Sequence, residues 1–452
     1  MQDITADLQD LSEALLTAAR KAGADQADAV AVRGSSLSVD TRDRALEHAE
    51  RADGVEIGLR VLLGGRQATV SASETSARTI NEMAERAIAM AREAPVDDNL
   101  ALADPDDLYC GAGDLADLAI MDPSAPPTPD TLLDRALRAE AAASDVAGVA
   151  RTDNANASYI RRGTWLATSN GFSNGYARSA HSISTVAIAG EGLAMERDWA
   201  AESRIWADDL PSPEEVGALA GQRTAERFGA RKPPTGSFPI LYDERIAAGL
   251  IGHLLSAANG ASVARGGSWL RNALHEVVLP EAYSLIENPR LPRMSSSRPF
   301  DAEGLATRPR DILRDGVLAG WSLDIATANK LGMTSTASAV RGISSPPSPG
   351  VSNVTLAGGT ADRADLIRDM GRGLIVTSML GSSINATTGD YSRGAAGFWV
   401  ENGEIAYPVN ECTIAGNLRD MLGGIIAATD LPDWRSHRVP SLLVQGMTIA
   451  GA

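Results

Sequence analysis

Five histidines are the first candidates for chemistry in this chain, because imidazole serves both as a metal ligand and as a general base. They are His48, His181, His253, His275 and His437. A zinc peptidase needs two or three His, Cys or carboxylate ligands, with a base beside the bound water. His275 and Glu276 begin an HExxH-like sequence, but Leu279 and Pro280 stand where the second histidine would be needed. This pair therefore predicts a surface histidine beside a glutamate.

His253 lies in a helix that we predict over residues 244–257. At about 3.6 residues per turn, it shares a face with Ile246, Leu250 and Ala257. Because that face is apolar, a histidine packed or hydrogen-bonded in the core is the default interpretation. Metal ligation by His253 is the alternative.

A polar segment over residues 385–394, with the sequence NATTGDYSRG, is the other candidate for a site. We predict a loop here, followed by a strand that begins near Phe398. One interpretation is an Asx-type turn in which Asp390 pairs with Arg393. The other is a loop along a groove that holds a peptide chain. The candidate groove or interface residues are Asn385, Thr388, Asp390, Arg393 and Trp399.

Three further features limit the possible functions. The sequence has no GxxxxGK[ST] phosphate loop. The formal net charge of −17, from 58 acids and 41 bases, disfavours binding to a nucleic-acid backbone. No run of about 18 apolar residues occurs, so we expect no membrane-spanning helix.

The expected compartment is the cytoplasm. The first residues, MQDITADLQDLSEALL, carry acids where an export signal would carry Lys or Arg. Cys110 and Cys412 are the only cysteines, which is typical of a reducing environment.

The N-terminal part predicts helices combined with antiparallel strands. Helical spacing over 8–22 stops at Gly23, two alternating stretches flank Gly64-Gly65, and a second helix covers 74–93. These elements form a first α/β unit.

A second unit of the same kind follows a stretch over 95–130 that is rich in Asp and Pro. A helix over 131–143 leads to strands joined by a tight turn at Asn170-Gly171. Ser212, Pro213 and Glu215 then form a capping box at the start of another helix.

The best domain boundary is the proline-rich sequence at 232–236, after which short β segments separated by glycine turns dominate. We therefore predict an α+β protein with two N-terminal α/β units and a β-rich C-terminal domain. The predicted boundaries are 1–105, 112–231 and 237–452.

Several segments resemble the TldD/PmbA family, in its TldE-type branch. They are residues 58–73, 299–308, 331–342, 352–359 and 385–418. The similarity spans nearly the whole chain, and the segments follow the order found in the family.

The resemblance has a direct implication for the metal site. In the family, TldD-type members bind zinc through a helical His-Glu-x-x-x-His motif and a cysteine near the C-terminus. The matching stretch here ends at His253, with Ala248 in place of the first ligand and Gly249 in place of the base. Neither can bind a metal or accept a proton. His437 as a substitute ligand stays an open alternative.

The function that the resemblance implies is that of a zinc-less subunit without catalytic residues or a cofactor of its own. It would pair with a TldD-like paralogue, which holds the zinc, and the heterodimer would act on peptides or unfolded proteins. A homodimer could form when the chain is alone. The alternatives are a homodimeric peptide-binding protein and an independent hydrolase in which His253 and His437 converge on a metal.

Overall fold

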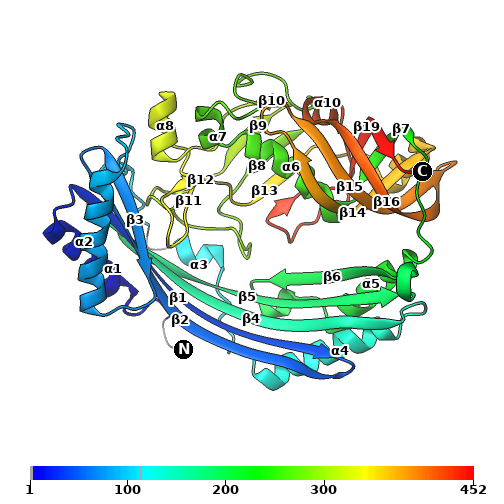
Figure 1. Cartoon of the computed structure of the whole chain (residues 1–452), viewed down its shortest axis with the longest axis horizontal. Coiled ribbons are helices and arrows are strands. Elements are labelled where there is room, and N and C mark those ends of the chain that lie inside the picture. Colours follow the sequence, from blue (N-terminus) through cyan, green and yellow to red (C-terminus); the bar gives the residue numbers. More distant parts are fainter. Residues whose placement is uncertain (1–3, 112–113) are drawn as a thin grey trace.

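The computed structural model describes residues 4–111 and 114–452. It confirms the α+β class, with helices and antiparallel strands in the N-terminal half and a β-rich C-terminal domain. Figure 1 shows the long N-terminal strands curving beneath the C-terminal domain.

A single antiparallel sheet forms the N-terminal half, in the order β3-β2-β1-β4-β5-β6. Its strands are β1 (Gln26–Arg42), β2 (Ala45–Leu63), β3 (Arg66–Ala72), β4 (Arg151–Thr168), β5 (Ser173–Ala189) and β6 (Glu196–Arg204). The hairpin turns fall where Gly64-Gly65 and Asn170-Gly171 predict them. The two predicted units contribute three strands each, and β1 pairs with β4 to join them. The boundaries within this half stay a prediction.

Two pairs of helices cover one face of this sheet. They are α1 (Leu8–Ala22) with α2 (Ala77–Glu93), and α4 (Pro129–Ser144) with α5 (Pro213–Glu226). Side chains alternate along a strand, so odd-numbered β1 residues face these helices: Ala29 and Ala31 pack with the first pair and Val39 with the second. The capping box of α5 is confirmed, since the Ser212 Oγ accepts from the Glu215 N–H and Glu215 accepts from the Ser212 N–H.

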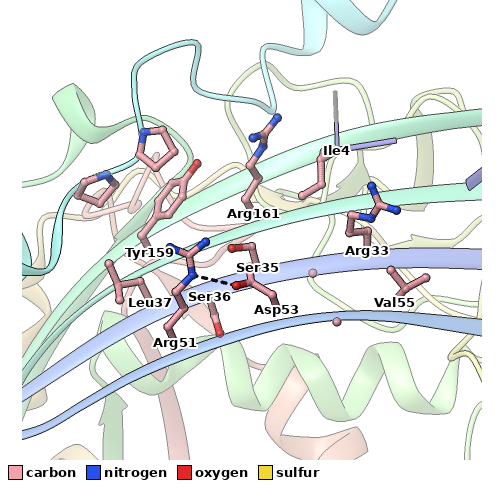
Figure 2. A pocket seen from close by; sticks show the side chains of 14 residues that line it. Ile4, Arg33, Ser35, Ser36, Leu37, Arg51, Asp53, Val55, Tyr159 and Arg161 are labelled. Carbon is pink, nitrogen blue, oxygen red and sulfur yellow. Dashed lines mark hydrogen bonds and ion pairs between the residues drawn. The ribbon is translucent and has the colours of Figure 1, made fainter. Parts of the chain in front are cut away.

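The middle of that face is left open between the two helical layers. A cavity of about 560 Å³ lies there. Figure 2 shows Arg33, Ser35, Tyr159 and Arg161 around it, and Arg51 paired with Asp53.

The C-terminal domain is built on a mixed six-stranded sheet in the order β16-β15-β14-β7-β19-β17, with a further pairing of β16 with β19. These strands are β7 (Gly236–Tyr242), β14 (Gly373–Ile384), β15 (Asp390–Glu401), β16 (Glu404–Asn417), β17 (Ile426–Ala427) and β19 (Leu442–Ala450). Its helices are α6 (Glu244–Ala257), α7 (Gly260–Ala264), α8 (Ile325–Leu331), α9 (Arg363–Met370) and α10 (Leu418–Gly423).

A smaller five-stranded sheet adjoins it, in the order β10-β9-β8-β13-β18, beside a two-stranded ribbon. The strands are β8 (Ser284–Glu287), β9 (Arg310–Arg314), β10 (Val317–Leu318), β13 (Val354–Ala357) and β18 (His437–Arg438), with β11 (Ala339–Val340) and β12 (Ser348–Pro349) in the ribbon.

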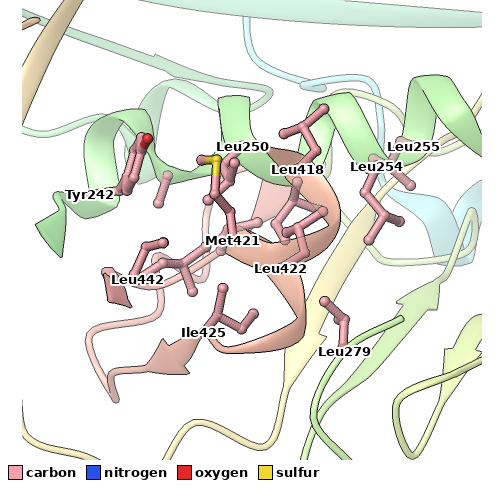
Figure 3. Close-up of a cluster of buried hydrophobic side chains, with 14 of the residues drawn as sticks. Tyr242, Leu250, Leu254, Leu255, Leu279, Leu418, Met421, Leu422, Ile425 and Leu442 are labelled. Carbon is pink, nitrogen blue, oxygen red and sulfur yellow. The ribbon is translucent and has the colours of Figure 1, made fainter. Parts of the chain in front are cut away.

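The core of the C-terminal domain lies around α6. Leu250 and Leu254 of α6 are fully buried and lie near Leu418 and Met421 of α10, as Figure 3 shows. The predicted helix over 244–257 is confirmed at both ends. The Asp243 carboxylate starts it by accepting from the Arg245 N–H.

The stretch over 95–130 contains η1 (Pro105–Asp107) and α3 (Asp114–Leu118) and connects the two halves. The Tyr109 N–H donates to the carbonyl of Gly304 at 2.9 Å. The Tyr109 ring packs with Phe300 and Phe172. Two further short helices, η2 (Gly192–Ala194) and η3 (Ala207–Asp209), flank β6. Across residues 4–111 and 114–452, no helix combines the length and apolarity that crossing a membrane requires.

The C-terminal domain approaches the N-terminal sheet very closely at Gly58 of β2. A Cβ atom added there would lie 2.2 Å from the carbonyl oxygen of Ile343. Only glycine therefore allows this contact without displacement of the backbone.

We expect Gly58→Ala to lower the free energy of unfolding by ~1–3 kcal/mol, because the new methyl group must push the Ile343 backbone away. Gly54→Ala in the same strand is the matched control, since a Cβ there meets nothing within 4 Å. We expect the control to lie within about 0.5 kcal/mol of the parent chain. Chemical denaturation of the three proteins measures the difference, and equal midpoints for both variants would contradict this account.

Candidate functional site

Helix α6 carries Ala248, Gly249 and His253, the three positions that the resemblance assigns to a degenerate zinc motif. Ala248 packs against the hydrophobic core of the C-terminal domain, and His253 lies one and a half turns further along, half-buried. Between them, Gly249 has open space above it: an added Cβ would meet only the Met379 Cε, at 3.8 Å. The helix is therefore intact, while two of the three motif side chains are a methyl group and a hydrogen.

His253 packs against an aromatic ring. The imidazole meets Tyr391 edge to face, with ring centroids 5.8 Å apart. Its Nε2 atom is buried, and no partner for it lies among the described residues. His253 is thus packed against Tyr391 but only half-buried, and its role stays a prediction.

The charge state of His253 follows from its surroundings. Burial lowers the pKa of His253, and the positive charge of Arg393 lowers it further. The imidazole is therefore neutral near pH 7. The same positive charge opposes binding of a metal cation beside it.

A thioether and a phenol occupy the space across from Gly249. The Tyr391 hydroxyl donates to the Met379 Sδ at 3.2 Å. A thioether is a weak acceptor and takes up no proton near neutral pH, so Met379 cannot act as a general base.

The second histidine proposed as a ligand lies elsewhere. His437 belongs to β18 in the five-stranded sheet, where burial lowers its pKa and Glu287 opposes that shift. His253 lies on α6, which packs on β14 of the six-stranded sheet. Within the described part of the chain, no three His, Cys, Asp or Glu side chains are grouped so that they could hold a metal ion.

The polar segment at 385–394 corrects two expectations. Its second half is not a loop, because β15 begins at Asp390. The Asp390–Arg393 ion pair is also wrong: Asp390 accepts from Thr388 Oγ1 at 2.6 Å and from Asn417, whereas the Arg393 Nε donates to the carbonyl of Gly381. The carboxylate is held by two neutral donors, which lower its pKa, and Arg393 is left to act on His253.

The two remaining candidate groove residues, Asn385 and Trp399, lie in different surroundings. Asn385 shapes the turn by accepting from the backbone N–H groups of Thr387 and Thr388. Trp399 is 1% exposed and lies in the core against Phe238, with ring centroids 5.0 Å apart. The peptide groove itself stays a prediction.

Sequence reasoning did not select the neighbours of His253. Met379 and Tyr391 stand on β14 and β15, and only the packing of α6 on these strands brings them to the histidine. Tyr391 lies within the polar segment at 385–394, but its distance in sequence from His253 does not indicate that the two residues are in contact.

Family comparisons match three successive parts of the chain. The PmbA/TldA metallopeptidase domain 1 matches residues 27–91, the central domain matches 122–228 and the C-terminal domain matches 235–451. Metalloprotease PmbA of Escherichia coli O157:H7 is 36% identical over 455 residues, which cover 100% of this chain and 98% of the relative. A PmbA homolog of Haemophilus influenzae is 36% identical, with coverage of 99% and 98%.

Solved structures have the same fold. A candidate modulator of DNA gyrase from Bacteroides thetaiotaomicron superposes with a TM-score of 0.89 at 27% identity, over 100% of both chains. TldE from Thermococcus kodakarensis superposes with a TM-score of 0.84 at 20% identity, over 97% of this chain and 99% of that one. On full-length identity and three consecutive domain matches, this chain belongs to the TldD/PmbA family of metalloprotease-like proteins.

Proposed function

We propose that this chain is the zinc-less, non-catalytic subunit of a heterodimeric TldD/TldE-type metalloprotease that degrades or processes unfolded or extended peptides. The observation that carries the proposal is the pair Ala248 and Gly249 on α6. At these positions the chain has no lone pair for a metal and no base for water, although the helix that would present them is formed.

The charge around His253 supports the same proposal. A single neutral imidazole gives one ligand, and the guanidinium of Arg393 adds repulsion toward a divalent cation. The zinc would therefore be held by a TldD-like paralogue, which also supplies the base.

An open strand edge supports a role in holding extended peptides. β14 pairs with β7 only from Leu374 to Val376, while β14 itself continues to Ile384. Among the described residues no strand pairs with its further part on that side, where Leu380 is 76% exposed. A peptide chain could add to this edge through backbone hydrogen bonds, as in other cases of strand addition.

We expect the purified chain to contain no stoichiometric zinc and to leave a casein-type substrate uncleaved. Cleavage should appear when a TldD-like paralogue from the same host is added, because the partner supplies the ligands and base. Elemental analysis and a cleavage assay with and without the partner measure both. Zinc at one equivalent with unaided cleavage would favour an independent hydrolase, and no stimulation of the partner would favour a homodimeric peptide-binding protein.

Restoring the motif should restore metal binding. We expect Ala248→His with Gly249→Glu to raise zinc affinity by at least about 100-fold, since α6 would then carry both histidine ligands and the glutamate of the family motif. Adding His253→Ala to this double variant is the control and should abolish the gain. Zinc titration by calorimetry tests this, and equal affinity with and without His253 would exclude the proposed site.

The electrostatic effect of Arg393 on His253 can be measured in the parent protein through the pKa of the imidazole. We expect the pKa of His253 to lie below the ordinary histidine value and to rise in Arg393→Gln, because a positive neighbour is removed. Since the folded-state pKa lies below the unfolded one, the contribution of His253 to stability falls as the pH drops through the ordinary histidine range. NMR titration of the imidazole measures this, with the exposed Arg271→Gln as control. An unchanged pKa in Arg393→Gln would remove the electrostatic part of the proposal.

A further inference from the structure

A cavity of about 360 Å³ lies between the N-terminal sheet and the C-terminal domain. Even-numbered β1 residues, Val30 and Val32, line it, so it opens on the sheet face opposite to the helices and to the cavity of Figure 2. Its volume is within the usual range of small-molecule sites, which begins at about 300 Å³.

Positive charge dominates the lining. Of the described residues that surround the cavity, four are arginines and one, Asp301, is an acid. Arg162 and Arg178 come from β4 and β5, whereas Arg298 and Arg341 come from the C-terminal domain. Such a concentration is unexpected in a chain whose net charge is −17.

The existing partners do not neutralise these arginines. Arg178 donates to two backbone carbonyls, of Ser295 and Ser297, which carry no net charge. Arg341 shares the carboxylate of Asp28 with Arg60. Over residues 4–111 and 114–452, the Arg341 Nε and Nη2 and the Arg298 Nε have no hydrogen-bond partner.

Two of the arginines face each other directly. Arg162 and Arg178 are register partners in the antiparallel pair β4–β5. Like charges directly opposite on neighbouring strands destabilise a sheet. An anion between or above them would turn that repulsion into attraction.

Asp301 does not fill this role. Its carboxylate already accepts from the backbone N–H groups of Glu303, Leu305 and Ala339. The one acid in the wall is therefore held by backbone groups of the C-terminal domain, and the four arginines outnumber the two nearby carboxylates, Asp301 and Asp28.

We propose that this inter-domain cavity binds a small ligand through a phosphate or carboxylate group, held between arginines of the N-terminal sheet and of the C-terminal domain. Guanidinium groups present paired N–H donors that match both oxyanions. No α6 residue is among the described residues that line this cavity.

The cavity of Figure 2 is a weaker case. There Arg51 is paired with Asp53 at 2.8 Å and Arg33 with Asp7 at 3.7 Å, so two of the three arginines in its lining each have an acidic partner. It also draws its charged walls from the N-terminal half alone.

The test uses the full chain and two probes at constant ionic strength set with chloride. The probes are inorganic phosphate and an N-acetylated dipeptide with a free C-terminal carboxylate, the latter compared with its amide. Calorimetry and thermal denaturation measure binding. We expect saturable binding of phosphate, weaker binding of the singly charged dipeptide and none of the amide.

Arg162→Gln should weaken binding by about tenfold or more, because a charge-assisted contact is lost. Arg162 stands opposite Arg178 in the sheet, so its replacement also removes a like-charge contact, and we expect the fold to be kept. Arg298→Gln provides a second variant from the other domain, and Arg20→Gln at the exposed end of α1 is the control of equal charge change. Phosphate preference or carboxylate preference would each support the site and assign its ligand class. Absence of saturable binding by both probes, or an equal loss in Arg20→Gln, would overturn the inference.

Discussion

The buried contact of Asp28 with two arginines is the constraint on which the arrangement of the two halves depends. Asp28 of β1 pairs with Arg60 of β2 at 2.5 Å and with Arg341 of the C-terminal domain, and all three side chains are buried. Burial alone would raise the pKa of Asp28, but the two guanidinium groups bring it below its ordinary value. Removing one partner from such a group typically costs about 3–5 kcal/mol, because a buried charge is left uncompensated. This buried cluster is therefore a strong contact between the C-terminal domain and the sheet, beside weaker ones such as those of Arg178 with Ser295 and Ser297.

Other features of the junction follow from that placement. The loop that carries Arg341 also brings Ile343 onto Gly58, where no side chain fits. The arginine-lined cavity lies beside this contact, where Val30 and Val32 of the sheet face the C-terminal domain without filling the space. Behind the junction, burial raises the pKa values of Asp301 and Glu303, and Arg60 acts against the shift of Glu303. The same desolvation that strengthens one ion pair thus makes neighbouring acids harder to ionise.

Much of the local structure could be predicted from sequence, because its causes are local. Helical spacing and a glycine stop define residues 8–22, and a capping box starts the helix at Ser212. The pairing of β1 with β4 could not be predicted, because it joins residues more than a hundred positions apart. The side-chain pattern of either strand is also compatible with other pairing partners. The start of β15 was misjudged for a related reason. Asp390 lies at the exposed end of the hairpin, where a polar residue is equally compatible with a strand end and with a loop.

For the candidate site too, some features could be predicted from the sequence and others could not. The proposed loss of a ligand and a base at Ala248 and Gly249 depends only on residue types, so it could be inferred from the sequence alone. The neighbours of these positions depend on the fold instead. Met379 lies near Gly249 and Tyr391 contacts His253 because β14 packs against α6 and β15 pairs with β14. These neighbours are important because a solvent-filled space beside His253 could admit a metal ion held by few protein ligands. A half-buried imidazole beside a thioether, a phenol and a guanidinium offers a cation neither charge nor enough donors.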